Sequence, residues 1–346
     1  MWSEARGAGW AGREERVAAR PTMHDVARVA GVSVTTVSRC INNDRYVRDS
    51  TRQKVDAAVA ELGFQRNDMA RALRPGQATA TIALVIEDVA NPFYSGIARG
   101  VDEVAQQNRH LLVVGNTELS FDRERELLGE LVRRRVDGLL VVPTAHDHRS
   151  LHADLGRWAP MVFIDRAPTG VPADAVLLDN RGGTRQAIEH LIAAGHRRIA
   201  YIGGDPSVYT GAQRLAGYRQ TLRKAGLTYH DELVSLGHHT DAAAREAVLA
   251  LLGRRGGPTA VFADNNRMTI GALHAVAESG GKVDVAGFDD LELADLLSMQ
   301  VALVTYRPDD LGRTAATLLF DRIRGDTRPP RRIVIKTELV MRGRPR

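Results

Sequence analysis

Residues 22–42 read Thr22-Met-His-Asp-Val-Ala-Arg-Val-Ala-Gly31-Val-Ser-Val-Thr-Thr-Val-Ser-Arg39-Cys-Ile-Asn42, which predicts two short helices joined by a tight turn. Thr22 and Asp25 have the spacing of a capping box at the start of the first helix. Gly31 suits a left-handed helix end, and Ser33 can cap the second helix. In this order these signals are typical of a helix-turn-helix, whose second helix enters a DNA major groove. DNA is therefore the first partner to consider.

The two predicted helices have an inner and an outer face. The inner face would bury Val26, Ala27, Ala30, Val37 and Ile41, and the outer face would carry Val34, Thr35, Thr36, Ser38 and Arg39. The small polar side chains of the outer face suit phosphate contacts. Arg39 is the long donor on this face, and a guanidinium can bond O6 and N7 of guanine together. The alternative is an exposed arginine on a generic two-helix hairpin.

A third helix is expected directly after this pair. Its apolar positions have the spacing of one buried helix face, and Gly63 follows its end; the positions are Val55, Ala58, Val59 and Leu62. Three such helices make a minimal core. Cys40 lies on the inner side of the second helix, which favours a small buried apolar residue over a redox sensor.

Length and charge predict a second, larger unit. The chain has 346 residues, far more than a three-helix domain needs. The net charge is +5, and residues 1–75 hold 13 Lys and Arg against 9 Asp and Glu, so +4 belongs to the first fifth of the chain. A basic head on a nearly neutral body is expected where phosphate attraction drives binding. Residues 1–20 lack apolar periodicity and are expected to be disordered.

The sequence also bears on the cellular compartment. A single cysteine excludes an internal disulfide framework and a cysteine-based zinc site. No run of eighteen apolar residues occurs, and the N-terminus lacks the hydrophobic stretch of a secretory signal. We therefore expect a cytoplasmic protein without a membrane partner.

From Thr81 onward, short apolar runs alternate with amphipathic stretches. The runs expected to be strands are 82–86, 111–114, 138–142, 161–164, 199–203, 260–263 and 283–287. Buried parallel strands have this pattern, so the body is predicted to contain two doubly wound halves. Ligands of such folds bind at the carboxyl ends of the strands. The loops that follow the strands are therefore the candidate pocket.

The chain resembles the transcriptional regulators of the LacI/GalR family from about Pro21 to Met341. In the head the resemblance rests on Asp25-Val-Ala, Ala30-Gly-Val-Ser, Thr36-Val-Ser-Arg39, Thr51-Arg, Lys54-Val, Glu61-Leu-Gly-Phe64, Asn67 and Ala70-Arg-Ala-Leu73. In the body it rests on Asn91-Pro-Phe93, Phe163-Ile-Asp-Arg166, Asp179-Asn180, Gly195-His-Arg-Arg-Ile199, Arg214-Leu-Ala-Gly-Tyr218, Gly287-Phe-Asp-Asp290 and Thr337-Glu-Leu-Val340.

The resemblance implies a small all-α helix-turn-helix head and an α/β body of two lobes that resembles periplasmic binding proteins, with three crossovers between the lobes. The expected divisions are a disordered extension at 1–20, the head at 21–64, a hinge helix and linker at 65–77, and the body at 78–346. Within the body, the first lobe is expected at about 80–180 and 307–330, and the second at about 181–304 and 331–341.

The resemblance also implies how DNA is bound. Residues 67–73 would fold into a helix on operator DNA, and Leu73 of both subunits would wedge into the central minor-groove step. An ordinary linker is the alternative. The implied partner is a palindromic operator bound by a homodimer, and the candidate DNA-binding residues are Thr22, Val34, Thr35, Thr36, Ser38, Arg39, Asn42, Tyr46, Thr51, Asn67, Ala70 and Leu73.

An effector, most simply a sugar or related polyol, would bind between the lobes. The candidate residues are Asn91, Phe93, Tyr94, Asp165, Arg166, Arg214, Asn265 and Asp289. By resemblance, Arg214 and Asp289 would bond hydroxyls or a carboxylate of the effector, and Phe93 and Tyr94 would pack on its flat side. Carboxylates and amides beside an aromatic wall suit polyhydroxylated rings. The alternatives are surface loop side chains and, for Asp165 and Asn265, turn caps.

Three segments depart from the family pattern. His238, His239 and Thr240 stand where an aromatic residue and a Gly-Tyr pair are common, so either His239 is the stacking platform or that platform is absent. The segment between Gly280 and Val283 lacks the usual longer loop. Arg48 stands where a serine commonly caps the third helix, so the cap is expected from Asp49 or Ser50.

An enzyme is the main rival class, but its motifs are missing. The sequence has no G-x-G-x-x-G opening a helix, no phosphate-binding loop, no G-x-S-x-G elbow and no H-E-x-x-H. It therefore predicts neither a catalytic residue nor a cofactor. A metal site is the alternative use of His146, Asp147, His148, His152 and Asp154, but their spacing favours a solvated loop. A transport-type binding protein is the second rival, and the helix-turn-helix opposes it.

Overall fold

The computed structural model describes residues 21–41, 44–64, 79–144, 147–155, 159–280 and 282–344. The chain divides at Pro75 and Gly76 into two compact units, which are described separately. In the described ranges no helix is long and apolar enough to cross a membrane.

The first unit contains three helices, α1 (Met23–Ala30), α2 (Val34–Ile41) and α3 (Asp49–Leu62). Thr22 and Asp25 form the capping box predicted for α1, and Gly31 ends that helix with a left-handed φ of 65°. The Ser33 hydroxyl accepts the Thr36 N–H at 3.1 Å and so caps α2. The core consists of Val26, Ala27, Val37, Cys40, Val55 and Ala58. The helix-turn-helix is therefore built as its sequence predicts, with Cys40 inside.

The start of α3 differs from the prediction. Arg48 is the residue before the helix, and no side chain makes a cap hydrogen bond there. The expected cap by Asp49 or Ser50 is wrong because the helix already begins at Asp49. The carboxylate of Asp49 lies in the first turn instead, where it interacts favourably with the helix dipole.

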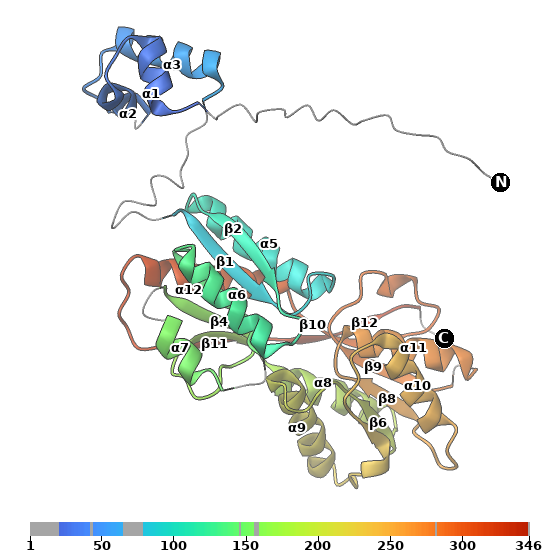
Figure 1. Ribbon diagram of the computed structural model, residues 1–346. Coiled ribbons are helices and arrows are strands. Elements are labelled where there is room, and N and C mark those ends of the chain that lie inside the picture. Colours follow the sequence, from blue (N-terminus) through green and yellow to red (C-terminus); the bar gives the residue numbers. More distant parts are fainter. Residues whose placement is uncertain are drawn as a thin grey trace, which may run out of the picture. The chain divides into compact units, whose positions relative to one another are not determined.

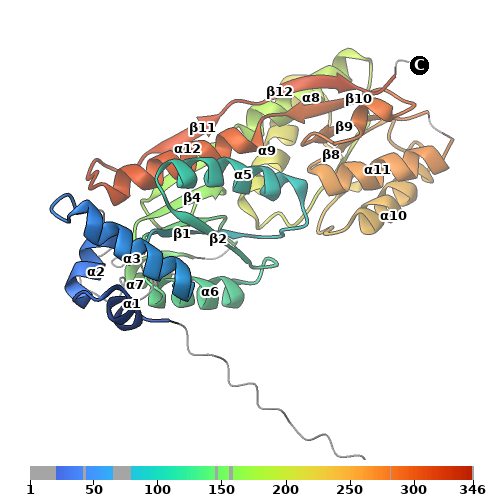
Figure 2. The same ribbon diagram turned by 90° about the horizontal axis from the view of Figure 1, so that it is seen from above.

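The second unit is formed by two six-stranded sheets (Figures 1 and 2). The first sheet has the order β11-β5-β4-β3-β1-β2, with β1 at Thr81–Ile86, β2 at Leu111–Asn116, β3 at Gly138–Val141, β4 at Met161–Asp165, β5 at Asp174–Leu178 and β11 at Arg332–Ile335. Its pairings are parallel, for example Leu84 opposite Val114 and Leu140.

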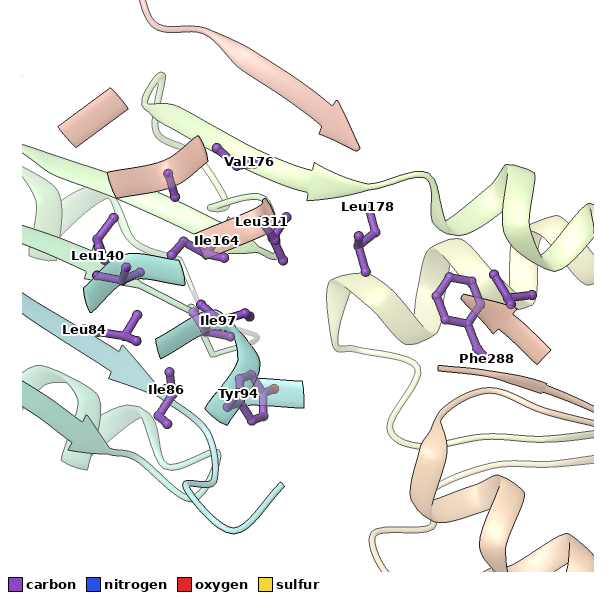
Figure 3. Packing of buried hydrophobic residues seen from close by; sticks show 14 of the residues in the cluster. Leu84, Ile86, Tyr94, Ile97, Leu140, Ile164, Val176, Leu178, Phe288 and Leu311 are labelled. Carbon is purple, nitrogen blue, oxygen red and sulfur yellow. The ribbon is translucent and has the colours of Figure 1, made fainter. Parts of the chain in front are cut away.

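Helices cover both faces of the first sheet. One face packs on α5 (Pro92–Gln107) and α12 (Pro308–Ile323), and the other packs on α6 (Phe121–Arg133) and α7 (Arg149–Leu155). Figure 3 shows the first of these layers, where Leu84 and Leu140 of the sheet lie near Ile97 and Leu311 of the helices. Strand residues alternate between the two layers, as expected for a sheet buried on both faces.

The second sheet has the same architecture. Its order is β12-β10-β9-β8-β6-β7, with β6 at Ile199–Ile202, β7 at Val234–Ser235, β8 at Ala260–Ala263, β9 at Asp284–Phe288, β10 at Val301–Thr305 and β12 at Glu338–Arg342. One face packs on α8 (Asn180–Ala193) and α9 (Tyr209–Lys224), the other on α10 (Asp241–Leu252) and α11 (Asn266–Glu278). Short 3-10 turns lie at Asp231–Leu233 (η1) and Ala294–Leu296 (η2).

The chain passes between the two sheets three times, after β5, after β10 and after β11. Residues 331–341 were expected in the second lobe, and this prediction is wrong for β11. Ile333 and Ile335 pair in register with Val176 and Leu178 of β5, so β11 completes the first sheet. β12 alone joins the second sheet, where it runs antiparallel to β10. β11 and β12 are both short, and only Lys336 and Thr337 separate them. The sequence therefore did not indicate that the chain changes sheets at this point.

Glycines let α5 and α12 approach at backbone distance. A Cβ built on Gly312 would lie 2.1 Å from the Ile97 carbonyl oxygen, and one built on Gly100 would lie 2.0 Å from the Asp309 carbonyl oxygen. Neither carbonyl can move without moving its helix. Only glycine therefore fits at these two positions.

His148 is buried, contrary to the solvated loop predicted for its segment. Its side chain is 1% exposed, and its Nε2 lies 3.0 Å from Oε1 of Glu124, a fully buried carboxylate on α6. The other Glu124 oxygen accepts the Thr144 N–H at 2.7 Å. His146 lies outside the described residues. In the part of the chain that is described, no three His, Cys, Asp or Glu side chains converge to hold a metal ion.

Candidate functional site

A cavity of about 460 Å³ lies between the two lobes, at the carboxyl ends of their strands. All eight predicted effector residues lie on its wall, namely Asn91, Phe93, Tyr94, Asp165, Arg166, Arg214, Asn265 and Asp289. They come from five separate segments of the chain, so only the parallel topology brings them together. That they contact an effector stays a prediction.

Arg166 anchors the wall formed by the first lobe. Its guanidinium pairs with the Glu87 carboxylate and donates to the Tyr94 hydroxyl at 3.1 Å. Tyr94 in turn donates to Glu87 at 3.0 Å. Burial raises the pKa of Tyr94 well above its ordinary value, so its hydroxyl stays protonated. The triad fixes the positions of three polar groups before any ligand arrives.

Asp165, the last residue of β4, carries an acceptor that the first lobe leaves unused. Its side chain is buried, and its Oδ1 has no hydrogen-bond partner among the described residues. Burial raises the pKa of this carboxyl to about 6, although Arg166 and Arg214 act in the opposite direction. Its φ of +65° lies in the left-handed region, a strained conformation typical of functional sites. A ligand hydroxyl in the cavity would satisfy this oxygen.

Asp165→Asn is expected to stabilise the ligand-free protein at neutral pH. Because the folded-state pKa of Asp165 exceeds the unfolded value, the native state binds more protons, and the stability contributed by this group falls as pH rises from about 4 to about 6. A pKa raised by about two units lowers the free energy of unfolding by about 2–3 kcal/mol at pH 7. Asparagine tolerates a positive φ and carries no charge.

Urea unfolding of wild type and Asp165→Asn at pH 4.5 and 7.5 measures this effect. We expect a higher midpoint for the variant at pH 7.5 and a clearly smaller difference at pH 4.5, where the folded carboxyl is protonated. An equal difference at both pH values would contradict the assignment, because it would show that the carboxyl does not titrate in this range.

Arg214 anchors the wall formed by the second lobe. Its Nε donates to Asn180 Oδ1 at 2.7 Å, and its Nη1 donates to the Asp264 carbonyl at 2.5 Å. The guanidinium carbon lies 3.7 Å from the centre of the Phe288 ring, a close cation–π contact. Burial alone would lower the pKa of Arg214, but the surrounding carboxylates, Asp289 foremost, raise it. This cation is therefore permanent and rigidly held.

Two carboxylates flank Arg214. Asp264 accepts from the Gly204 N–H at 3.1 Å and from the Tyr201 hydroxyl at 3.3 Å, and burial raises its pKa to about 6. Asp289 has a φ of +75° and accepts from the Asn266 N–H at 3.1 Å and from the Tyr306 hydroxyl at 2.5 Å. Both carboxylates are thus oriented by the protein itself.

Side chains of the two lobes also meet across the cleft. Asn266 donates its amide to Asn91 Oδ1 at 2.8 Å, and Arg267 forms an ion pair with Asp88. Asn91 has a second role, because it caps α5 by accepting the Phe93 N–H at 3.1 Å. Asn265 caps α11 by accepting the Met268 N–H at 3.0 Å, so the turn-cap alternative holds for this residue while it also lines the cavity.

Several cavity residues were not predicted from the sequence. They are Glu87, Asp88, Glu118, Asp205, Asp264, Asn266 and Arg267. Most of them immediately follow a predicted strand, so the rule that placed Asn91 and Asn265 would have found Asp88 and Asp264 as well. His238 and His239 both line the cavity, and His239 is exposed. His238 is held by a hydrogen bond of 2.8 Å to Ser235.

The charge of the cavity wall is strongly asymmetric. Its carboxylates are Glu87, Asp88, Glu118, Asp165, Asp205, Asp264 and Asp289, and its permanent cations are Arg166, Arg214 and Arg267. Seven acidic groups against three arginines disfavour an anionic ligand. They provide many acceptors for a ligand rich in hydroxyl groups.

The head presents its candidate DNA residues on the outside. Thr35 and Arg39 of α2 are exposed, and Tyr46 is 79% exposed. Val34, predicted to face outward, instead packs against the head core. The Nε of Arg39 lies 3.9 Å from the Asp44 carboxylate, a long ion pair at the surface. Asn42, Asn67, Ala70 and Leu73 lie outside the described residues.

Comparisons with known proteins agree on both units. Residues 22–67 match the bacterial regulatory proteins of the lacI family, and residues 188–343 match the periplasmic binding protein-like domain. The transcriptional regulator CelR of Thermobifida fusca is 38% identical over 93% of this chain and 98% of its own length. The ribose operon repressor of Escherichia coli is 35% identical over 93% of this chain and 99% of its own length.

Solved structures give the same result. A CelR–cellobiose complex is similar with a TM-score of 0.70 and 36% identity, covering 93% of this chain and 98% of that one. The lac repressor dimer bound to operator and the anti-inducer ONPF has a TM-score of 0.82 and 27% identity, covering 92% and 97%. With the helix-turn-helix and the two-lobed cavity, these matches show that the chain belongs to the lacI family and is a DNA-binding transcriptional regulator.

Proposed function

We propose that this regulator is a repressor whose affinity for a palindromic operator is controlled by a neutral sugar bound between the lobes. The observation that carries the proposal is the cavity wall, on which fixed acceptors from both lobes surround Arg214. A ligand that touches both lobes binds one lobe arrangement better than another, and this difference in affinity is what couples the cavity to DNA binding.

The chemistry of the wall supports a sugar rather than an anion. Asp165 and Asp289 offer carboxylate oxygens to hydroxyl donors, and Arg214 offers donors to hydroxyl or ring oxygens. Phe93 and Tyr94 lie side by side, with ring centres 4.9 Å apart, as an apolar wall for the flat side of a ring. The relatives support the same class, since one is bound to cellobiose and another is named for ribose.

A homodimer fits both the DNA and the surface of the body. Two identical heads match two identical half-sites of a palindrome. β2 is an edge strand with three exposed apolar side chains, Leu111 at 66%, Val113 at 38% and Val114 at 41%. Because such an edge is prone to pair with another chain, we propose that a second copy covers it.

Selection of duplexes from a random library, followed by footprinting, tests the function. We expect a palindromic site protected over both half-sites, a dimer by sedimentation, and release of that site by a neutral sugar in a screen of sugars, polyols and sugar phosphates. An asymmetric site bound by a monomer would refute the dimer. Release by sugar phosphates alone would refute the neutral ligand.

Arg39→Ala is expected to relax selection at one base pair in each half-site, because Arg39 is the long exposed donor of α2. The loss should be about 1–3 kcal/mol for operator DNA and much smaller for random DNA. Thr36→Ala is the control, since loss of a phosphate contact weakens all sequences alike. Binding isotherms on operator and on single-base variants measure the difference. Equal losses on operator and random DNA would exclude base reading by Arg39.

A further inference from the structure

A second groove, of about 530 Å³, lies on the outer surface of the second lobe beside α9. Its floor is apolar and consists of Ala212, Leu215 and Ala216 on one face of the helix. Its rim is basic and consists of Arg181 at the start of α8 with Arg219 and Arg223 of α9. Figures 1 and 2 show α8 and α9 adjacent to each other and apart from α10 and α11.

The arginines of this rim are not neutralised. Arg181 and Arg223 are exposed and form no ion pair with any carboxylate in the described part of the chain. Arg219 is also exposed and is held over the Tyr229 ring at 4.8 Å, donating to its hydroxyl at 2.9 Å. The α9 sequence contains no acidic residue at all. Three guanidinium groups therefore border an apolar strip without a counter-charge.

Several arginines elsewhere in the body are paired. Arg245 lies 2.6 Å from Glu278, Arg313 lies 2.9 Å from Glu103, and Arg342 lies 2.6 Å from Asp290. The body as a whole is nearly neutral, because +4 of the net charge of +5 belongs to residues 1–75. Within this nearly neutral body, the rim therefore gathers three arginines beside one groove, none of which has a carboxylate partner among the described residues.

We propose that this groove docks an acidic segment of a partner protein, with carboxylates on the arginine rim and apolar side chains on the strip. A guanidinium binds a carboxylate through two parallel hydrogen bonds, which gives the rim both affinity and direction. The apolar strip distinguishes this occupant from nucleic acid, whose phosphate backbone has no apolar groups to place there. The open shape distinguishes it from a small anion, since small ligands are mostly enclosed by their pockets.

The groove shares its walls with the ligand cavity. Arg214, on the opposite face of α9, lines the cavity, whereas Leu215 lines the groove. Pro206 borders the groove, and its neighbour Asp205 borders the cavity. A segment that clamps α9 and this loop would therefore act on the same elements that hold the effector. Docking and effector binding are expected to influence each other's affinity.

The test uses the full chain and a fluorescein-labelled peptide of repeated Glu-Glu-Leu, followed by anisotropy at low salt, where screening is weak. The test variant is Arg181→Gln with Arg223→Gln. The matched control is Arg125→Gln with Arg255→Gln, which removes the same charge from exposed positions elsewhere on the body. We expect the test variant to lose affinity for the peptide about tenfold or more and the control to lose less than about twofold.

Three further measurements separate the possible occupants. Replacing leucine by serine in the peptide should weaken binding to wild type, because the apolar strip then has no contact. Full displacement of the peptide by inorganic pyrophosphate would make this a small-anion site. An equal loss of random-duplex affinity in the test variant would make it a nucleic-acid surface. Either result, or unchanged peptide binding by the test variant, overturns the proposal.

Discussion

Arg214→Ala is expected to abolish the response to the effector and to leave operator binding in place. The guanidinium contacts Asn180, the Asp264 carbonyl and the Phe288 ring, and it is the cation among the carboxylates of Asp264 and Asp289. Its removal withdraws donors from the ligand and leaves buried carboxylates without their partner. Losing a buried charged contact lowers affinity by about 3 kcal/mol or more, which is roughly a hundredfold.

Calorimetry with the sugar found in the screen, together with operator titration, measures both expectations. Lys224→Ala is the matched control, since it removes an exposed cation from the same helix. Arg214→Lys keeps the positive charge but lacks the planar guanidinium. We expect it to recover the stability of the protein but little of the affinity for the sugar. Sugar affinity retained by Arg214→Ala would place the effector outside this cavity. Loss of operator binding by a folded variant would show that Arg214 acts on the DNA-bound state itself.

Gly312→Ala is expected to be among the most destabilising single changes in the body. Its new methyl group would lie 2.1 Å from the Ile97 carbonyl oxygen, so α12 and α5 would have to separate. The helices bury Ile97 and Leu311 between them and the sheet, and separation would loosen that whole layer. Overpacking against backbone exceeds the usual range for core substitutions, and we expect a loss on the order of 4 kcal/mol.

Gly129→Ala gives the matched control for this measurement. Gly129 lies within α6, where a Cβ would meet only the end of the Arg133 side chain, at 3.5 Å. Alanine there should stabilise the protein by about 0.5–1 kcal/mol through helix propensity. Urea unfolding monitored by circular dichroism compares the two variants. A loss of unfolding free energy of only about 1 kcal/mol for Gly312→Ala would contradict the prediction, because it would show that α5 and α12 can move apart at little cost.

Local signals in the sequence were sufficient for the head. Thr22, Asp25 and Gly31 act within a few residues of one another, so their spacing alone predicts the capping box and the turn. The same local logic failed at Arg48, because the first N–H groups of a helix that begins at the surface can bond water instead of a side-chain cap. Short-range patterns thus predict where helices lie better than how each helix begins.

Prediction of the cavity depended on the topology of parallel sheets. Asn91 and Asn265 are far apart in the sequence, yet both were placed by the rule that loops after strands converge. The cross-cleft pairs Asn91–Asn266 and Arg267–Asp88 had no such signal, since the sequence does not tell how far the lobes are closed. The burial of His148 was missed for a related reason, because its partner Glu124 lies on a distant helix.

The path of the chain between the sheets determines the order in which the lobes can be completed during synthesis. The first lobe begins with β1 but needs α12 and β11, so a ribosome that has released residues up to β10 has produced only part of it. By then the second lobe, from α8 to β10, lacks only β12. The lobe encoded later is therefore nearly finished first, which reverses the usual N-terminal-first order for domains. Until α12 emerges, the apolar side of the first sheet that it covers stays open to chaperones and to aggregation.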